Sequence, residues 1–292
     1  MTARPDRVTL AAFLVLILIG GSNFVAVRYL NAEIPPFASA GARFCVASLL
    51  FFVAMRVTRT PFPYGAAVAG ALVYGVVNFA LGYAFAYTGL QQVPAGTASV
   101  IMATVPLLTT VLAVVHRIER PDPRPFIGAL IGFAGIAVIF VEQLSANVPP
   151  LYMLAMTGSA LSAAEAAVLV KRFPRTHPIS TNAIAMLVGG VALVLLSVIT
   201  GEHVTVPYLA VTWWVFAYIA TLGTAGLFVP LLYVINSWTA SAATYALLAA
   251  PIVAISLGSV LRSEPVTPFF LVGALIVAAG VYIGALRRSA GA

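Results

Sequence analysis

Apolar segments long enough to cross a bilayer follow one another along the whole chain, separated by short turns. A helix needs about 20 mostly apolar residues to cross the hydrocarbon core. Of the 292 residues, 62% are hydrophobic and 8% are charged, whereas a soluble domain carries roughly 25% charged residues. So few charges could not cover a surface in water, so we expect an all-α integral membrane protein surrounded by the lipid bilayer.

The turns divide the chain into ten candidate spans. Pro35-Pro36 and Pro149-Pro150 mark two of the boundaries, and other turns carry proline or charge. The third and eighth spans are long, and we expect them to be tilted, or kinked at Gly82 and Gly223. The predicted spans are residues 8–28, 36–56, 64–88, 94–116, 125–141, 150–171, 179–200, 207–234, 240–261 and 268–286.

Basic residues set the predicted orientation. The net charge is +7, but the 15 Lys and Arg residues form no patch with interleaved aromatic residues, so no nucleic acid is expected as a partner. Loops rich in Lys and Arg stay in the cytoplasm. With both termini cytoplasmic, most of the basic residues fall on that side, namely Arg4, Arg7, Arg56, Arg59, Arg117, Arg120, Arg124, Lys171, Arg172, Arg175, Arg287 and Arg288.

An internal repeat relates the two halves of the sequence. A gapless shift of 145 residues places proline on proline and charge on charge, which apolar composition alone does not explain. We therefore predict two repeats, residues 1–145 and 146–292. The matches include Pro106 with Pro251, Arg117 with Arg262, Glu119 with Glu264, Pro123 with Pro268, and residues 128–131 with 273–276.

Five spans in each repeat make the two repeats inverted, because an odd number of crossings reverses the direction of entry into the membrane. Inverted repeats are the architecture of many secondary transporters. Two similar halves of opposite orientation can exchange conformations around one central cavity, which gives alternating access. The sequence thus predicts a transporter of small molecules without specifying its substrate.

Several segments carry a family resemblance. They are Gly20 to Arg28, Arg43, and Ala95 to Ser99 leading to Pro106 and Glu119, repeated as Ala240 to Pro251 and Glu264. The chain resembles the EamA-type ten-helix members of the drug/metabolite transporter superfamily, most closely the YddG-type amino-acid exporters. The usual Trp before the helix-1 glycine is absent.

The resemblance implies export of amino acids or related metabolites, with aromatic or apolar side chains, across a bacterial-type inner membrane. Cationic drugs and purines are alternative cargoes in the same superfamily. A monomer or a weak dimer is expected, and proton coupling and facilitated flux both stay open.

Two charged residues lie within apolar spans, where charge is costly and usually functional. Glu165 is a candidate for proton coupling and for binding a substrate ammonium group, or else a carboxyl kept neutral by burial or a structural hydrogen bond. Arg43 is a candidate for a substrate carboxylate or for gating, or else snorkels or binds backbone carbonyls. An axial separation of roughly 12 Å, at 1.5 Å per residue, argues against a direct ion pair between them.

Polar and aromatic residues within other spans complete the candidate binding site. Asn23 falls on Glu165 when the first span is laid on the sixth. Each of these residues could instead pack between helices. The further candidates for substrate binding are Asn23, Tyr74, Asn78, Gly82, Ser99, Met102, Thr244 and Tyr245.

Four residues that are matched by the repeat suggest moving parts. Pro106 and Pro251 remove a backbone hydrogen bond in the middle of a span, and we expect them to act as hinges. Glu119 and Glu264 lie at span ends, where they are candidates for gating contacts or for helix caps.

An intramembrane enzyme is the alternative from another class. The sequence has two Asp, both in predicted loops, and its 3 His lie in loops or at span ends. No nucleophile–base pair is visible, no Walker A motif is present, and the single Cys45 cannot form a metal site or an intrachain disulfide. We therefore expect no enzymatic activity, no cofactor and no metal.

Overall fold

The computed structural model describes residues 6–30, 33–93, 95–141, 148–262 and 267–286, without the side chains of residues 24, 25, 28, 95, 96, 258, 259, 261 and 262. Within these residues, eight helices are long and apolar enough to cross a membrane, and two shorter apolar helices join them. The helices are α1 Arg7–Leu30, α2 Pro36–Thr58, α3 Ala66–Tyr74, η1 Gly75–Leu81, α4 Gly82–Gly89, α5 Ala95–Met102, α6 Val105–Val115, α7 Pro123–Ile139, α8 Pro150–Leu169, α9 Pro178–Ile199, α10 Ala210–Ala220, α11 Ala225–Ser237, α12 Ala240–Thr244, α13 Ala246–Arg262, α14 Pro268–Val281 and η3 Tyr282–Leu286.

These helices form the ten predicted spans, numbered 1 to 10 in chain order. Five spans are single helices (α1, α2, α7, α8 and α9), and five are built from consecutive helices. The composite ones are span 3 (α3, η1, α4), span 4 (α5, α6), span 8 (α10, α11), span 9 (α12, α13) and span 10 (α14, η3).

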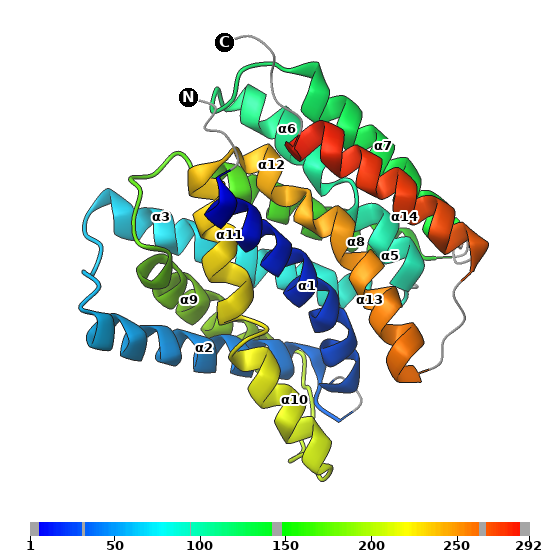
Figure 1. Cartoon of the computed structure of the whole chain (residues 1–292). Coiled ribbons are helices and arrows are strands. Elements are labelled where there is room, and N and C mark those ends of the chain that lie inside the picture. The colour runs from blue at the N-terminus through cyan, green and yellow to red at the C-terminus, as the bar shows by residue number, and fades with distance from the viewer. Residues whose placement is uncertain (1–5, 31–32, 94, 142–147, 263–266, 287–292) are drawn as a thin grey trace.

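The packing of the spans has the symmetry that an inverted repeat requires. Span 2 packs against span 7, and span 5 against span 10, so each pair joins equivalent helices (Figure 1). Span 1 packs against spans 8 and 9, while its equivalent, span 6, packs against spans 3 and 4. Exchanging the repeats leaves this set of contacts unchanged. The prediction of ten helices in two inverted five-helix repeats is confirmed.

Repeated glycines form the contact between spans 5 and 10. A Cβ on Gly135 would lie 2.9 Å from the carbonyl oxygen of Gly273, and a Cβ on Gly273 would lie 2.6 Å from that of Gly135. Gly128 and Gly280 face each other in the same reciprocal way. Because the repeat copies both glycines, the two backbones approach closely at two symmetric points, as small residues allow in membranes.

Spans 3 and 8 are interrupted near the middle. Span 3 changes to a π-helix over Gly75–Leu81, immediately before Gly82. Span 8 breaks between Ala220 and Ala225, and Gly223 lies in the break. The shift of 145 residues places the π-helix on the break, so the predicted kink positions correspond to equivalent interruptions in both repeats. Unwound segments of this kind surround the binding sites of many transporters.

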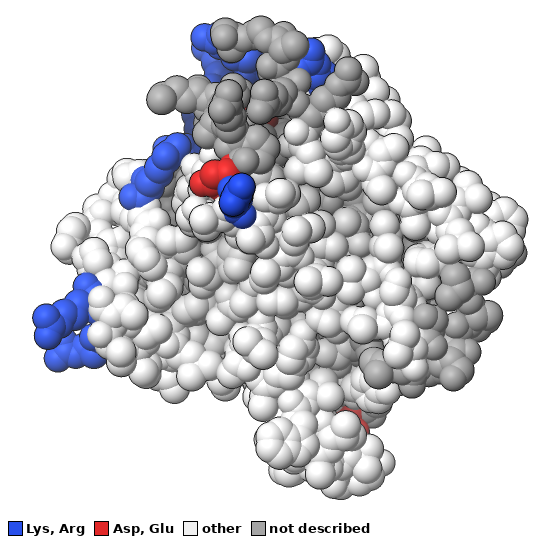
Figure 2. Space-filling view, in the orientation of Figure 1, with Lys and Arg blue, Asp and Glu red and all other residues white. Residues whose placement is uncertain are grey.

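One end of the bundle carries all the described Lys and Arg side chains except Arg43. Spans 1, 3, 5, 7 and 9 begin at this basic end, and η3 ends there, so the two ends of the described chain lie on the same side. Figure 2 shows Lys and Arg along the upper and left edges of the molecule, whereas the broad central surface carries almost no charge. This surface is apolar because it faces the lipid.

Candidate functional site

A continuous column of aromatic rings occupies the centre of the bundle. Ring centroids are 4.9 Å apart between Phe44 and Phe79, 4.7 Å between Phe44 and Tyr83, and 4.7 Å between Phe79 and Phe228. Spans 2, 3 and 8 thus meet at these four rings. We call the whole set the aromatic column; its members are Phe37, Phe44, Tyr74, Phe79, Tyr83, Tyr87 and Phe228.

Arg43 lies inside this column. It is only 4% exposed, and its guanidinium carbon lies 4.6 Å from the centroid of the Phe44 ring and 5.1 Å from that of Tyr83. Its Nε has no hydrogen-bond partner, and no acid among the described residues pairs with it. The interpretation that Arg43 snorkels outward is therefore wrong. Ring faces attract the cation, but a buried charge without a counter-charge stays costly.

Two of the predicted amides lie at the interruptions of spans 3 and 8. On span 3, the Asn78 Nδ2 lies 3.4 Å from the hydroxyl of Tyr74, which is 2% exposed. On span 1, the Asn23 Nδ2 donates to the carbonyl oxygen of Gly223 at 2.6 Å, a group that the break in span 8 leaves free. The Asn23 Oδ1 is buried and has no partner. The structure thus places Tyr74 beside Asn78, and Asn23 at the equivalent interruption.

Glu165 binds a residue that no sequence pattern joins to it. Its Oε1 lies 3.3 Å from the Nε2 of His116, at the end of α6. On the other side of the ring, the Arg172 Nη1 lies 3.4 Å from the His116 Nδ1. A guanidinium can only donate, so Nδ1 accepts and Nε2 carries the hydrogen that points to Glu165. The three side chains form one hydrogen-bonded chain between spans 4 and 6.

This chain lies on the outer side of the bundle. Leu154 and Leu161 of α8 are 68% and 47% exposed, and Glu165 continues the same stripe one turn later. Four residues separate Glu165 from the end of α8 at the basic end, roughly 6 Å of axial rise. Glu165 therefore lies apart from Arg43 and the aromatic column.

Both ends of the bundle are closed by a glutamate from one repeat that caps a helix of the other. At the basic end, Glu119 accepts from the backbone N–H of Ser241 at 3.2 Å and from its hydroxyl at 2.8 Å. At the opposite end, Glu202 accepts from the N–H groups of Phe37 and Ala38 at 3.0 and 2.8 Å. A carboxylate at a helix N-terminus is favourable for both the free N–H groups and the helix dipole.

A half-buried lysine accompanies the contact at the basic end. Lys171, beyond the end of α8, donates to the carbonyl oxygen of Trp238 at the end of α11. Burial lowers the pKa of Lys171 from its ordinary value, and the nearby Glu119 carboxylate opposes that shift. Spans 4, 6, 8 and 9 therefore meet at one charged contact.

The other predicted site residues are spread over the spans. Thr244 donates to the carbonyl of Ser241, and Tyr245 donates to that of Pro125 at the start of α7. Both bonds lie at the basic end, away from the aromatic column.

Ser99 and Met102 are partly buried on α5 of span 4, where Met102 packs near Met156 of span 6. Gly82 faces Ser162 of span 6. These residues line the contact between spans 3, 4 and 6.

The matched prolines differ in their surroundings. Span 4 breaks at Ala103 and Thr104, and Pro106 lies in the first turn of the new helix α6, where proline costs no hydrogen bond. Pro251 lies inside α13. Glu264, the repeat partner of Glu119, lies outside the described residues.

The aromatic partners of Arg43 were not among the predicted residues. A signal for them existed, because Phe79, Tyr83 and Tyr87 recur at intervals of four along span 3 and so share one helix face. Phe44 and Phe228 gave no such signal. No group of three His, Cys, Asp or Glu side chains that could hold a metal occurs in the described part of the chain.

Two inverted five-helix repeats that enclose buried polar groups at interrupted spans define a membrane transporter. The chain belongs to the EamA-like transporter family, whose model matches it twice, at residues 8–141 and 150–285. Each match covers five spans.

Relatives extend over almost the whole chain. The uncharacterized transporter YoaV of Bacillus subtilis (strain 168) is 26% identical over 276 residues, which cover 93% of this chain and 94% of that protein. The uncharacterized inner membrane transporter YedA of Escherichia coli (strain K12) is 30% identical over 87% of this chain and 82% of its own length. A Salmonella typhimurium protein named "Probable amino-acid metabolite efflux pump" is 24% identical over 95% of this chain and 96% of that protein.

The fold is also found in a solved structure. A protein crystal structure with 17% sequence identity superposes with a TM-score of 0.80, over 97% of this chain and 98% of the other. At this identity, the likeness concerns the fold alone.

Proposed function

We propose that this protein is a secondary transporter that exports amino acids with aromatic or apolar side chains, by alternating access around the centre of the bundle. The observation that carries the proposal is Arg43, a buried cation that pairs with no described acid and lies over the rings of Phe44 and Tyr83. A substrate carboxylate would supply the missing counter-charge. The neighbouring rings would bind an apolar or aromatic side chain.

The same site argues against cationic cargo. A cation in the aromatic column would meet the charge of Arg43 without a described acid nearby to offset it, at a low effective dielectric constant. Purines are not opposed in this way, because they are flat and can stack on rings. The name of the Salmonella relative, an amino-acid metabolite efflux pump, supports amino acids as the cargo.

Inverted symmetry supplies the conformational change. In the proposed cycle, the basic end opens when the bonds between Glu119 and Ser241 break. The opposite end opens when the bonds from Phe37 and Ala38 to Glu202 break. Spans 3 and 8 flex at their interruptions, Gly75–Leu81 and residues 221–224. The basic end faces the cytoplasm, by the rule that Lys and Arg stay inside, so substrate enters there.

Proton coupling is a separable part of the proposal. The pair of His116 and Glu165 is the acid–base contact between spans that the described residues show, and both groups are of the kind that carries protons in coupled transport. A proton gained or lost by this pair would change the contacts of His116 with Arg172 and Glu165. A change in the contact of spans 4 and 6 would follow.

Flux in liposomes tests the main proposal. Purified protein is reconstituted, and efflux of labelled phenylalanine, leucine, adenine and a quaternary ammonium drug is measured against protein-free liposomes. We expect phenylalanine and leucine to move and the cationic drug not to move. Flux of the drug or of adenine, with neither amino acid transported, would overturn the assignment.

A pH gradient across the same liposomes tests coupling. We expect the gradient to accelerate phenylalanine efflux in the wild type and not in Glu165→Gln or His116→Gln. Equal acceleration in all three proteins would remove this pair from the coupling mechanism while leaving amino-acid export intact.

A further inference from the structure

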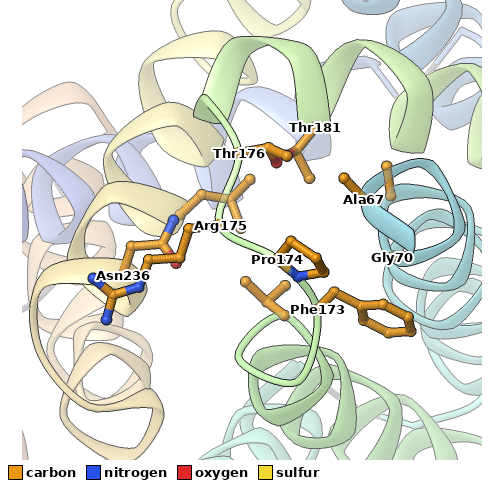
Figure 3. A pocket seen from close by; sticks show the side chains of 11 residues that line it. Ala67, Gly70, Phe173, Pro174, Arg175, Thr176, Thr181 and Asn236 are labelled. Carbon is orange, nitrogen blue, oxygen red and sulfur yellow. The ribbon is translucent and has the colours of Figure 1, made fainter. Parts of the chain in front are cut away.

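A small hollow opens at the basic end of the bundle, between span 3, span 8 and the turn that leads into α9. Its volume is about 20 Å³, enough for one water molecule. In Figure 3, Arg175 and Asn236 lie together on one side, Phe173 lies beside Gly70 on the other, and Thr176 lies against Thr181. The hollow therefore combines a cation, an amide and hydroxyls with an apolar wall.

An unsatisfied amide directly follows one of the lining residues along α9. Asn182, the residue after the lining residue Thr181, is 0% exposed, and neither its Oδ1 nor its Nδ2 has a hydrogen-bond partner. The Nε1 of Trp238, two residues beyond the lining Asn236, is also buried and unbonded. Buried polar groups are almost always bonded, and each exception calls for an explanation such as an absent ligand.

The register of the helices directs Asn182 inward. Asn182 and Gly189 are seven residues apart on α9 and so share a face, and a Cβ on Gly189 would lie 2.1 Å from the Cβ of Phe79. That face is turned toward span 3 and the aromatic column. On span 8, Phe228 of the column lies two turns from the lining Asn236. The helices that form the hollow therefore continue directly to the column.

We infer that this hollow is the closed entrance of the substrate path, and that Asn182 forms a first binding subsite for the zwitterionic head group of an amino acid, separate from Arg43. This inference rests on the proposed function. An amide both donates and accepts, so Nδ2 serves a carboxylate and Oδ1 an ammonium group. Arg43, which can only donate, then takes the carboxylate deeper in the bundle.

The path so defined has two stages. An amino acid enters the hollow past Arg175, exchanges its water for the amide of Asn182, and moves along the column until its carboxylate reaches Arg43. The basic end must open for this, since the hollow now holds no more than a water molecule. The contact of Glu119 with Ser241 is the described carboxylate bond that closes the same end.

Stability and transport together test the role of Asn182. Asn182→Leu removes two unbonded polar atoms with little change in volume. If the amide of Asn182 forms hydrogen bonds only to a bound substrate, Asn182→Leu loses no bond in the substrate-free protein. Its melting temperature should then be equal to or higher than that of the substrate-free wild type. The half-saturation concentration for phenylalanine on the basic side should rise about 3- to 10-fold, the effect of one hydrogen bond.

Ser48→Ala is the matched control. Ser48 donates at 2.6 Å to the carbonyl of Ala183, the neighbour of Asn182, and is equally buried. We expect this change to lower the melting temperature and leave the half-saturation concentration unchanged. A fall in melting temperature in Asn182→Leu with unaltered phenylalanine kinetics would show a structural role and overturn the inference.

Thiol labelling tests the entrance itself. In a Cys45→Ala background, Asn236→Cys should react with a membrane-impermeant maleimide from the basic side, and phenylalanine should slow the reaction. Thr200→Cys, exposed at the other end of α9, should react from the opposite side without protection. Absence of protection at Asn236→Cys, in protein that transports phenylalanine, overturns the inference alone. Absence of amino-acid flux in the wild type overturns the proposed function instead.

Discussion

At the scale of single residues, the chain bears the cost of a buried positive charge in the middle of its fold. Arg43 is 4% exposed and lies over two rings, which recover part of its lost hydration. To offset the whole cost of its desolvation, the guanidinium group needs hydrogen bonds to an anion. An intermittent partner, such as a substrate carboxylate, stabilises the protein when bound and leaves when the site reopens to water.

Substitution of Arg43 tests this reading directly. Arg43→Gln keeps a polar head but removes the charge, so we expect the half-saturation concentration for phenylalanine to rise about 10- to 100-fold, the effect of a charged hydrogen bond. Arg43→Lys keeps the charge but lacks the planar guanidinium group. Its half-saturation concentration should lie between those of the wild type and Arg43→Gln. Arg56→Gln, at the exposed end of the same helix, is the control and should leave flux unchanged. Equal kinetics in Arg43→Gln would remove Arg43 from the site.

The sequence marks Arg43 and Glu165 as functional candidates by one signal, a charge inside an apolar span. It could not distinguish them, because the face on which a helical residue lies depends on the neighbouring helices. Exposure of Leu161 places Glu165 on the outer stripe, whereas packing against Phe44 and Tyr83 places Arg43 at the centre. Counting residues gives the depth of Arg43 and Glu165 along their helices. It does not give the side of the helix that faces the centre of the bundle.

At the scale of the helices, the boundaries follow local chemistry that the sequence displays. Proline occupies the first turn of α2, α7, α8, α9 and α14, where its missing N–H costs nothing. The predicted starts of these five spans therefore agree with the structure to within two residues. The π-helix in span 3 was foreseen only as a kink. Within it, Gly75 packs closely against Ala185 of α9, a contact between distant segments that no local pattern shows.

The break in span 8 gives a prediction for Gly223. A Cβ at this position would lie 2.4 Å from the Oδ1 of Asn23 and 2.8 Å from the Cα of Ile219. Gly223→Ala should therefore displace Asn23 and reduce phenylalanine flux at least about tenfold, since it disturbs a bond to a free carbonyl. In Gly226→Ala, the new Cβ meets only the flexible end of Ile19, at 2.9 Å. That variant should transport normally; similar losses in both would show general helix destabilisation.

The two capping glutamates give a paired prediction. Glu119→Ala removes bonds that hold the basic end closed, and Glu202→Ala removes those at the opposite end. Each charged bond stabilises by about 1.5–3 kcal/mol, enough to shift a two-state equilibrium. We expect Glu119→Ala to speed labelling of Asn236→Cys in the Cys45→Ala background, and Glu202→Ala to slow it. Equal labelling rates in the three proteins would show that these bonds cap helices without gating.

At the scale of the whole molecule, the helix packing is symmetric between the two repeats, whereas the buried polar and charged residues are not. Span 2 packs against span 7 and span 5 against span 10, so each pair joins equivalent helices of the two repeats. Yet Arg43 has Val188 as its counterpart at the shift of 145 residues, and Asn23 has Val168. Symmetry allows the exchange of conformations, whereas asymmetry allows one central site and a preferred direction.

Orientation in the membrane is the last property that the whole fold predicts. The described Lys and Arg side chains other than Arg43 gather at the basic end, so that end should face the cytoplasm. Green fluorescent protein fused after residue 292 should then fluoresce in a bacterial host. Alkaline phosphatase inserted after Gly201, in the turn at the opposite end, should be active, because it folds only outside the cytoplasm.

Inserted instead after Thr60, on the basic side, the phosphatase should be inactive. The reverse pattern would place the basic end outside, and the hollow beside Asn182 would then be the exit of an exporter. In that case, an amino acid leaving the cell would reach Arg43 before Asn182. The substrate gradients alone would then set the direction of transport.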